Sequence, residues 1–301
     1  MRDFHWNEDF ERARQFLIDI WNAGPLYRNW IPSGLENRKF GPGGTEYLDE
    51  EDEYVKIWED SESNIAAITI VKPSGECWIL IHPEHLDAEE ELVLWIEDYR
   101  KRSKKDITEE VPIHFVVQDD DEQRQNLLKK LGYERTEVEG ADQVYDMSHE
   151  PPDYQLPEGY SVRHVAVNEE WEKYRAVQKA VFTHIKDMSQ KILYIYSTAS
   201  FYVPELDIVA VDPDGNFAAF CTGRIDPVSK IAELEPVGTH PDHRKKGLGK
   251  AVILECLKRL KEYEPPAIVI LGAAATEGAN RLYESVGFMN NGLRYYWTKK
   301  V

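Results

Sequence analysis

Residues 231–250, IAELEPVGTHPDHRKKGLGK, decide the fold of the C-terminal half of this chain. The stretch is typical of a β-strand that ends near Pro241, followed by a short basic loop and two glycines that open an amphipathic helix. Glycine lets a backbone approach a ligand without a Cβ in the way, and the first N–H groups of a helix have no partner inside the helix. The loop also gathers cationic side chains, namely Arg244, Lys245, Lys246 and Lys250. The pattern predicts a binding site for a ligand that carries a polyphosphate group.

Two common nucleotide-binding patterns do not fit this loop. The Walker pattern needs a glycine where Arg244 stands and a Ser or Thr where Ala251 stands. The dinucleotide-binding fingerprint needs a small third residue, and that position holds Val252.

The run Arg244–Gly249 resembles the Arg/Gln-x-x-Gly-x-Gly/Ala loop that binds coenzyme A in the GNAT acetyltransferases. The resemblance extends in both directions along the chain. Residues 204–227 are typical of two strands joined by a turn at Pro213–Asn216, and residues 267–273 of a buried strand. Residues 278–288, GANRLYESVGF, resemble the last helix of the family and the glycine–aromatic pair that ends it. The resemblance implies an acetyltransferase that uses acetyl-CoA, with loop residues Arg244, Lys245, Lys246, Gly247, Leu248, Gly249 and Lys250 as its phosphate site.

The N-terminal half resembles a degenerate copy of the C-terminal half. Ile81–His85 parallels Thr239–His243, and Gln125–Tyr133 parallels Asn280–Phe288 at a similar spacing, which indicates a duplicated fold. Where the second copy has its basic glycine loop, the first has Leu86–Glu91 with four acidic residues, and Leu128 stands at the position of Tyr283. The resemblance is to tandem GNAT proteins of the mycothiol synthase type.

We therefore predict an α/β fold of two tandem GNAT-like domains, each a mixed, mostly antiparallel sheet flanked by helices. Residues 1–148 form the degenerate, non-catalytic domain, residues 149–158 a proline-rich linker, and residues 159–301 the catalytic domain. In the first domain we expect helices at 8–22, 87–101 and 121–131 and strands near 54–60, 64–72, 76–82 and 112–118. In the second we expect helices at 168–182, 247–261 and 277–286, strands at 160–165 and 293–301, and irregular chain at 183–205.

Composition narrows the functional classes. The chain has 301 residues and a formal charge of −19, and residues 1–150 hold 17 Lys and Arg against 36 Asp and Glu. This acidity argues against nucleic-acid binding; it favours solubility, with attraction of cationic substrates as the alternative. No run of 18 apolar residues indicates a membrane span, and the polar start is not a secretory signal. Cys77, Cys221 and Cys256 stand in apolar surroundings, which predicts buried thiols and a cytoplasmic location.

Acetyl transfer to an amine needs a base for the amine, a donor for the oxyanion and a proton for the leaving thiolate. For the base we nominate Glu235, acting directly or through water, with Glu233 as the alternative and a purely structural carboxylate as the other reading. Pro236 and Gly238 inside a strand predict a bulge or a close approach.

The family resemblance implies three further roles. The Val237 N–H is the oxyanion donor, and Val237, Gly238 and Thr239 hold the pantetheine arm. Tyr283 protonates the leaving sulfur and contacts the cofactor, unless it is a core aromatic. Asn280 binds the pantetheine or phosphate region, unless it is the helix N-cap.

The acceptor amine is expected at residues 183–205, with His184, Tyr194, Tyr196 and Tyr202, and at the long segment 23–46, which forms a lip or is disordered. A small molecule fits better than a peptide, and the protein is expected to be a monomer or homodimer. The histidine pairs His82/His85 and His240/His243 flank Pro–acid turns and are interpreted as structural, with no metal site. A non-catalytic acyl-CoA sensor and a scaffold protein remain as alternatives to the enzyme.

Overall fold

The computed structural model describes residues 1–301 except 24–29, 42–54, 103–110, 184–188 and 274–275. The chain divides into two compact units. The first consists of Met1–Pro32, Tyr47–Asp142 and Gly292–Val301, and the second of Ser33–Glu46 and Gln143–Asn291. The chain therefore passes more than once between the units, and each unit is described by itself below.

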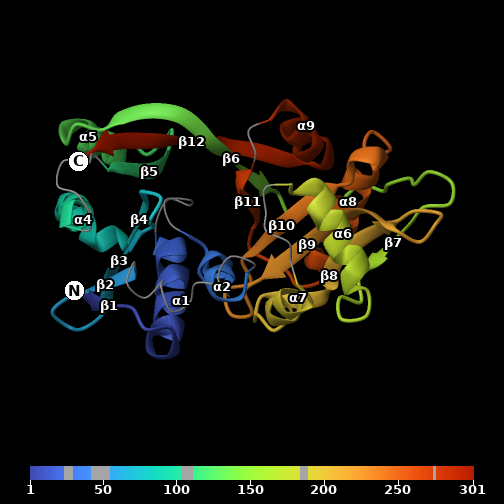
Figure 1. The fold of residues 1–301 in the computed structure, drawn as a ribbon, viewed down its shortest axis with the longest axis horizontal. Helices are drawn as coiled ribbons and strands as arrows, with labels where there is room; N and C mark the ends of the chain where they lie inside the picture. Colours follow the sequence, from blue (N-terminus) through green and yellow to red (C-terminus); the bar gives the residue numbers. More distant parts are fainter. Residues whose placement is uncertain (24–29, 42–54, 103–110, 184–188, 274–275) are drawn as a thin grey trace. The chain divides into compact units, whose positions relative to one another are not determined.

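The second unit is built on a mixed sheet in the order β11-β10-β9-β8-β7 (Figure 1). Strands β7 to β10 pair antiparallel, while β10 and β11 pair parallel. The elements are β7 Ser161–His164, α6 Trp171–Val181, α7 Gln190–Tyr196, β8 Tyr202–Val211, β9 Phe217–Ile225, β10 Ala232–Thr239, the short 3-10 helix Pro241–His243, α8 Leu248–Lys261, β11 Ile268–Ala273 and α9 Glu277–Val286.

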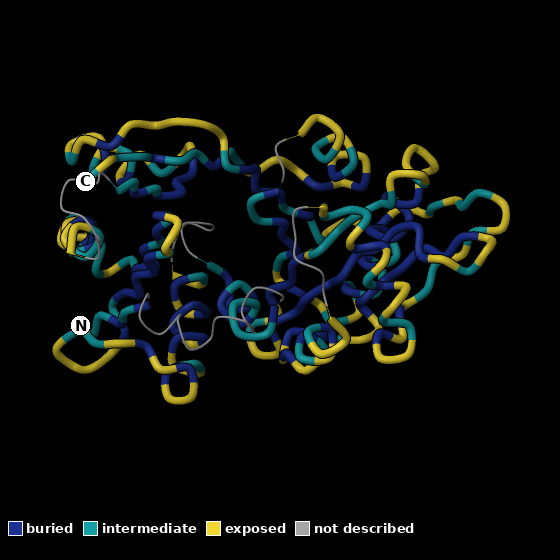
Figure 2. Tube along the Cα trace, viewed as in Figure 1, coloured by how far each residue is buried: buried dark blue, intermediate teal, exposed yellow. Residues whose placement is uncertain are grey.

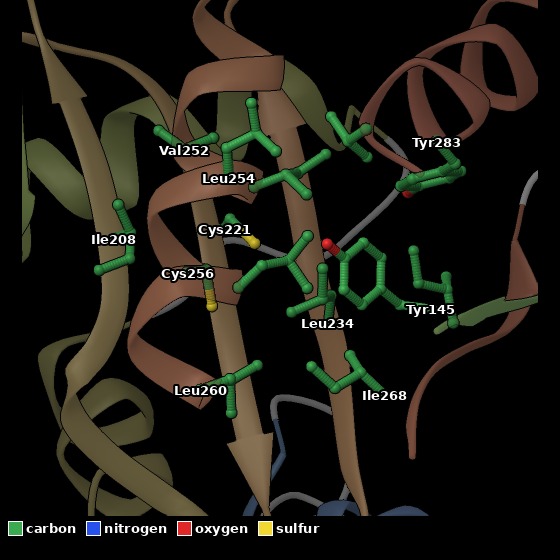
Figure 3. Close-up of a cluster of buried hydrophobic side chains, with 14 of the residues drawn as sticks. Tyr145, Ile208, Cys221, Leu234, Val252, Leu254, Cys256, Leu260, Ile268 and Tyr283 are labelled. Carbon is green, nitrogen blue, oxygen red and sulfur yellow. The ribbon is translucent and has the colours of Figure 1, made fainter. Parts of the chain in front are cut away.

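Helices cover both faces of this sheet because successive strand residues point to opposite sides. On β8, Ile208 packs in a cluster with residues of α8 and α9, including Leu254 and Tyr283 (Figure 3). Its neighbour Val209 packs on the other face with residues of α6 and α7. The central strand β9, FAAFCTGRI, is consequently buried along its whole length (Figure 2).

The first unit repeats the same plan. Its sheet has the order β1-β2-β3-β4-β5-β12, with β1 to β4 antiparallel, β4 and β5 parallel, and β5 and β12 antiparallel. Its elements are β1 Arg2–Asp3, α1 Trp6–Ala23, β2 Val55–Glu59, β3 Ile65–Val71, β4 Glu76–Ile81, a 3-10 helix Pro83–Ala88, α4 Glu89–Arg102, β5 Pro112–Gln118 and α5 Glu122–Lys130. The strands β6 Glu134–Tyr145 and β12 Phe288–Lys300 each carry the chain from one unit to the other.

The mixed α/β fold with two similar units confirms the predicted fold class, and the expected helices and strands agree with the structure to within a few residues. The division of the chain differs from the predicted one. The boundary falls after Asp142 and not after residue 148, and Gly292–Val301, predicted as the last strand of the second domain, belong to the first unit. There, Arg294 to Lys300 pair with Gln118 to Pro112 of β5, and Trp297 is buried in the core.

Two helices were not predicted. Residues 183–205 were expected to be irregular, but Gln190–Tyr196 form α7, capped by Ser189, whose hydroxyl accepts from Ile192 N. The segment 23–46 contains α2, Pro32–Phe40; the remainder of that segment, including Tyr27, lies mostly outside the described residues. From Ser33 onward, α2 belongs to the second unit, where the carboxylate of buried Glu36 accepts hydrogen bonds from the backbone N–H and the hydroxyl of Ser200.

Candidate active site

The predicted irregularity in β10 is present at Glu235–Pro236. Leu234 lies opposite Gly223 of β9 and Val237 opposite Cys221, so two residues of β10 face one residue of β9. A proline cannot donate to a sheet ladder, which places it naturally in such a bulge. Gly238 is a close approach as well, because a Cβ there would lie 2.6 Å from the ring of Phe220.

Beyond Glu233, β10 and β11 separate. Their parallel register joins Ala232 to Ile268 and Glu233 to Val269, whereas β10 remains paired with β9 as far as Thr239. The described part of β11 does not pair with Val237 or Thr239, so it leaves the backbone groups on this edge of β10 without a strand partner.

The basic loop leads from β10 into α8 with the expected backbone. Gly247 is the N-cap residue of α8 with φ 80°, a left-handed conformation that favours glycine. A Cβ on Gly247 would meet no described atom within 4 Å, so the space in front of the loop is open. Gly249 is needed for packing, because its Cβ would lie 2.8 Å from Thr239 Oγ1. The N-terminal end of α8, which attracts anions, therefore opens to solvent at Gly247.

The cationic side chains of the loop differ in their hydrogen-bond partners. Lys250 Nζ donates to Ser285 O at 2.8 Å, and Arg244 Nε to Thr239 O at 3.4 Å. Lys246 Nζ donates to Tyr160 Oη at 2.9 Å, and no contact of Lys245 with a described residue is recorded. Arg244, Lys245 and Lys246 are all exposed, as a phosphate site requires.

Glu235 and Glu233 are in different environments although they are two residues apart. Glu233 is buried and its Oε1 accepts from Arg224 Nη1 at 3.1 Å. Glu235 is accessible to solvent, yet protein atoms surround it on enough sides that desolvation raises the pKa of its carboxyl; Arg224 opposes this shift and Glu233 adds to it. Because Glu235 is exposed on one side, its desolvation is partial. Of the two carboxylates, Glu235 is the one free to accept a proton.

Tyr283 reaches from α9 toward the sheet, within the cluster that includes Leu234 and Cys221 (Figure 3). It is 9 % exposed, and its ring meets the edge of Phe288 at 5.9 Å. Burial raises the pKa of its phenol far above the usual range, and the negative charge of Glu235 raises it further. Tyr283 is thus both a core aromatic and an electrostatic neighbour of Glu235, and it keeps its proton at any physiological pH.

Asn280 is not the N-cap of α9. That position is held by Thr276, whose hydroxyl accepts from Ala279 N at 3.3 Å. Asn280 lies inside the helix, and its Oδ1 is buried without a hydrogen-bond partner among the described residues. A buried acceptor with no partner costs free energy, and a ligand donor can satisfy it.

Of the aromatic residues expected at the acceptor site, His184 lies outside the described residues, Tyr194 is exposed, and Tyr196 and Tyr202 are buried. Both buried phenols belong to polar networks. Tyr202 Oη donates to Asp207 at 2.9 Å, and Tyr196 Oη accepts from Arg224 Nε at 2.8 Å.

The sequence reasoning missed Arg224, which binds both Tyr196 and Glu233. A signal was present, because Arg224 is the one charged residue in the strand FAAFCTGRI, and a cation in a mostly apolar strand requires a buried partner.

The corresponding place in the first unit is filled by side chains of the chain itself. There β4 and β5 also separate after a short parallel register, Glu76 with His114 and Cys77 with Phe115. Arg124 of α5 reaches in and donates to Ile79 O at 3.1 Å and to Glu89 Oε1 at 2.5 Å. Glu89, at the start of α4, matches Gly247 in the duplicated order, so a carboxylate stands where the second unit has a glycine.

The histidine pairs have structural contacts. His82 and His240 each accept, through Nδ1, the backbone N–H two residues later, from Glu84 and Asp242. Within the described residues no group of three or more His, Cys, Asp or Glu could hold a metal ion. The three cysteines are free thiols and buried, as predicted. Among the described helices none is long and apolar enough to cross a membrane.

Comparisons with known proteins support the sequence resemblance. The model of the acetyltransferase (GNAT) family matches residues 165–288. A mycothiol acetyltransferase of Arthrobacter sp. is 30 % identical over 146 residues, which are 46 % of this chain and 45 % of that protein. One of Streptomyces coelicolor is 27 % identical over 143 residues, 46 % of each. The chain thus matches less than half the length of these curated relatives.

Two solved structures share the fold over almost the whole chain. A tandem GNAT protein from the clavulanic acid biosynthesis pathway has a TM-score of 0.70 at 15 % identity, covering 99 % of this chain and 97 % of that one. A GCN5-related N-acetyltransferase from Sphaerobacter thermophilus has a TM-score of 0.66 at 16 % identity, covering 99 % and 94 %. At these identities the likeness concerns the fold alone. The separated strands and the glycine loop lie within residues 165–288, the segment that is similar to the acetyltransferase (GNAT) family.

Proposed function

We propose that this protein is an acetyl-CoA-dependent N-acetyltransferase that moves the acetyl group to an amine by direct attack through a tetrahedral intermediate. One observation carries the proposal: β10 leaves β11 after Glu233 and runs directly into the exposed glycine loop that opens α8. That arrangement joins an open strand edge to an anion-binding helix terminus.

The residues of this site fit coenzyme A. The open edge of β10 at Val237, Gly238 and Thr239 would hold the amide-containing pantetheine arm, and the loop Arg244–Lys250 its diphosphate. The buried, unpartnered Oδ1 of Asn280 would accept a donor of the same ligand. Bound acetyl-CoA would supply an activated acetyl thioester.

Glu235 would take the proton from the acceptor ammonium, directly or through a water, because only the neutral amine has a lone pair for attack. Glu233 is the weaker candidate, since Arg224 already binds its carboxylate. The Val237 N–H, next to the bulge, would donate to the oxyanion.

Tyr283 would donate its proton to the departing thiolate. Its buried phenol is neutral at physiological pH, so the proton is available. The sulfur of the cofactor would have to contact this hydroxyl, which makes Tyr283 a cofactor-binding residue too.

For the acceptor we propose a small amine in preference to a peptide. Glu235 is open to solvent, and its negative charge favours a cationic amine in the ground state.

The test is a screen of small amines with acetyl-CoA, following the release of free thiol. The proposal expects thiol release that requires both the protein and one class of amine. Coenzyme A binding without thiol release for any amine would favour the acyl-CoA sensor, and no binding at all would favour the scaffold protein.

A further inference from the structure

A buried ion pair lies beside the candidate base and has no part in the mechanism above. Arg224 on β9 is 4 % exposed and lies opposite Glu233 on β10 in the strand register. Its Nη1 donates to Glu233 Oε1 at 3.1 Å. A buried guanidinium is costly unless its donors are satisfied, and Glu233 accepts from one of them.

The other side of the guanidinium is bound by α7. Arg224 Nε donates to Tyr196 Oη at 2.8 Å, and its Cζ lies 5.4 Å from the ring centre of Tyr196 and 5.0 Å from that of Phe201. Since Tyr196 Oη accepts from Arg224, its own proton is directed elsewhere. It donates to Glu235 O at 3.5 Å, a long contact that reaches the backbone of the bulge.

Arg224 therefore binds Glu233, just before Leu234, directly, and is linked through Tyr196 to Glu235, just after it. The bulge at Glu235–Pro236 interrupts the backbone hydrogen bonds between β10 and β9. Side-chain contacts therefore help to hold the backbone of the bulge in place.

Several ionisable groups surround Glu235. Glu233 lies on the same strand as Glu235. Arg224 and Cys221 on β9 and Tyr283 on α9 are its other electrostatic neighbours. Behind Arg224, on β8, Asp207 accepts from three hydroxyls, those of Tyr174 at 2.7 Å, Thr222 at 2.8 Å and Tyr202 at 2.9 Å. Among these groups, in the described part of the chain, Arg224 carries the positive charge.

We propose that Arg224 is a positioning residue for acetyl transfer: with Tyr196 it holds the bulge that presents Glu235, and it keeps a positive charge beside that carboxylate. The inference rests on the proposed role of Glu235 as the base. It predicts that Arg224 lowers the pKa of the Glu235 carboxyl without contacting the cofactor.

The experiment measures the titration of Glu235 directly, so that it does not depend on finding the acceptor. Glutamate carboxyls labelled with ¹³C are followed by NMR across pH in the full-length protein with coenzyme A present, and Glu235→Gln identifies the signal. In Arg224→Met the Glu235 signal is expected to titrate at higher pH than in the wild type, because a cation favours the ionised form. Arg224→Lys is expected to restore most of the wild-type titration.

Coenzyme A affinity within about twofold of the wild type shows that the variants retain the fold and the cofactor loop. An unchanged Glu235 titration in Arg224→Met would overturn the proposal. So would a coenzyme A affinity that falls more than about tenfold together with the titration shift, since that indicates general damage to the unit.

Tyr196→Phe provides a second variant that keeps the buried ring. It is expected to lower kcat roughly fivefold with KM for acetyl-CoA unchanged, in line with the loss of one hydrogen bond. Tyr174→Phe is the matched control, because it removes an equally buried hydroxyl that binds Asp207 and not the bulge. Equal kcat values for the two variants would refute the bridge to Glu235. A wild-type protein inactive on every amine would refute the proposed function and leave the NMR result standing.

Discussion

At the scale of single residues, the site depends on groups whose protonation is fixed by their surroundings. Glu235 and Tyr283 are electrostatic neighbours, and both have a raised pKa, through partial desolvation of the Glu235 carboxyl and burial of the Tyr283 phenol. A carboxyl that releases its proton late is a better base, while a phenol that never ionises remains an acid. The two groups are thus prepared for opposite roles.

Tyr283→Phe tests the acid. The ring, and so the packing against Phe288, is retained, but the proton donor is lost. We expect kcat to fall by at least about tenfold while the Kd for coenzyme A stays within about twofold. Tyr263→Phe, two residues after the end of α8, is the control and should keep wild-type turnover. Full activity in Tyr283→Phe would remove this tyrosine from the mechanism.

The pH dependence tests the base. Glu235 must be ionised to accept a proton, so kcat is expected to rise with pH through a midpoint above that of an ordinary glutamate. No descending limb from Tyr283 is expected below about pH 10, because its pKa is raised beyond the usual tyrosine value. Glu235→Gln should abolish the ascending limb. A limb that persists in this variant would assign the base to another group.

At the scale of elements, the loop before α8 distinguishes the two units. Gly247 has φ 80° and faces open space, whereas Glu89 fills the matching position of the first unit with a carboxylate. A carboxylate at a helix N-terminus is favourable for the helix and excludes a second anion.

Gly247→Glu applies the same change to the second unit. The new carboxylate would repel the diphosphate and strain the left-handed backbone, so coenzyme A affinity should fall at least about tenfold in calorimetry. Gly215→Glu is the matched control, since Gly215 has φ 82° in the hairpin turn between β8 and β9. It introduces equal charge and similar strain away from the loop. Equal loss of affinity in both variants would show that the effect is not local.

Arg124→Ala tests how the first unit is filled. Removing the guanidinium takes away the Arg124 partner of the buried Glu89 carboxylate, which should destabilise the first unit by about 3–5 kcal/mol in denaturant unfolding. Lys130→Ala, on the same helix, breaks an exposed pair with Glu90 and should cost less than about 1 kcal/mol. If the two costs are similar, the Arg124–Glu89 pair does not support the unit.

Much of the site was visible in the sequence because it depends on local patterns. The bulge followed from Pro236 and Gly238, and the helix start from Gly247 and Gly249. The pairing of Arg224 with Glu233 was not predicted, since it depends on which strands lie side by side and in which register. The same holds for α2, whose Glu36 finds Ser200 far away in the chain.

At the scale of the whole molecule, the duplicated fold is visible in the sequence. It is not visible there that each unit includes a segment from the other half of the chain. The unit that contains the glycine loop includes α2 from the N-terminal half, and the first unit includes Gly292–Val301 from the end of the chain. Nothing local in the run LRYYWTKKV reveals that it pairs with β5, because its alternation suits any half-buried strand. Long-range pairing of this kind is decided by packing.

The most direct measurement of the central claim is a crystal structure of the full chain with acetyl-CoA. The account predicts one cofactor molecule per chain, with its diphosphate on the amides of residues 244–250 and its pantetheine arm along Val237–Thr239. Density for the cofactor between β4 and β5 of the first unit, or none at the glycine loop at saturating concentration, would contradict it.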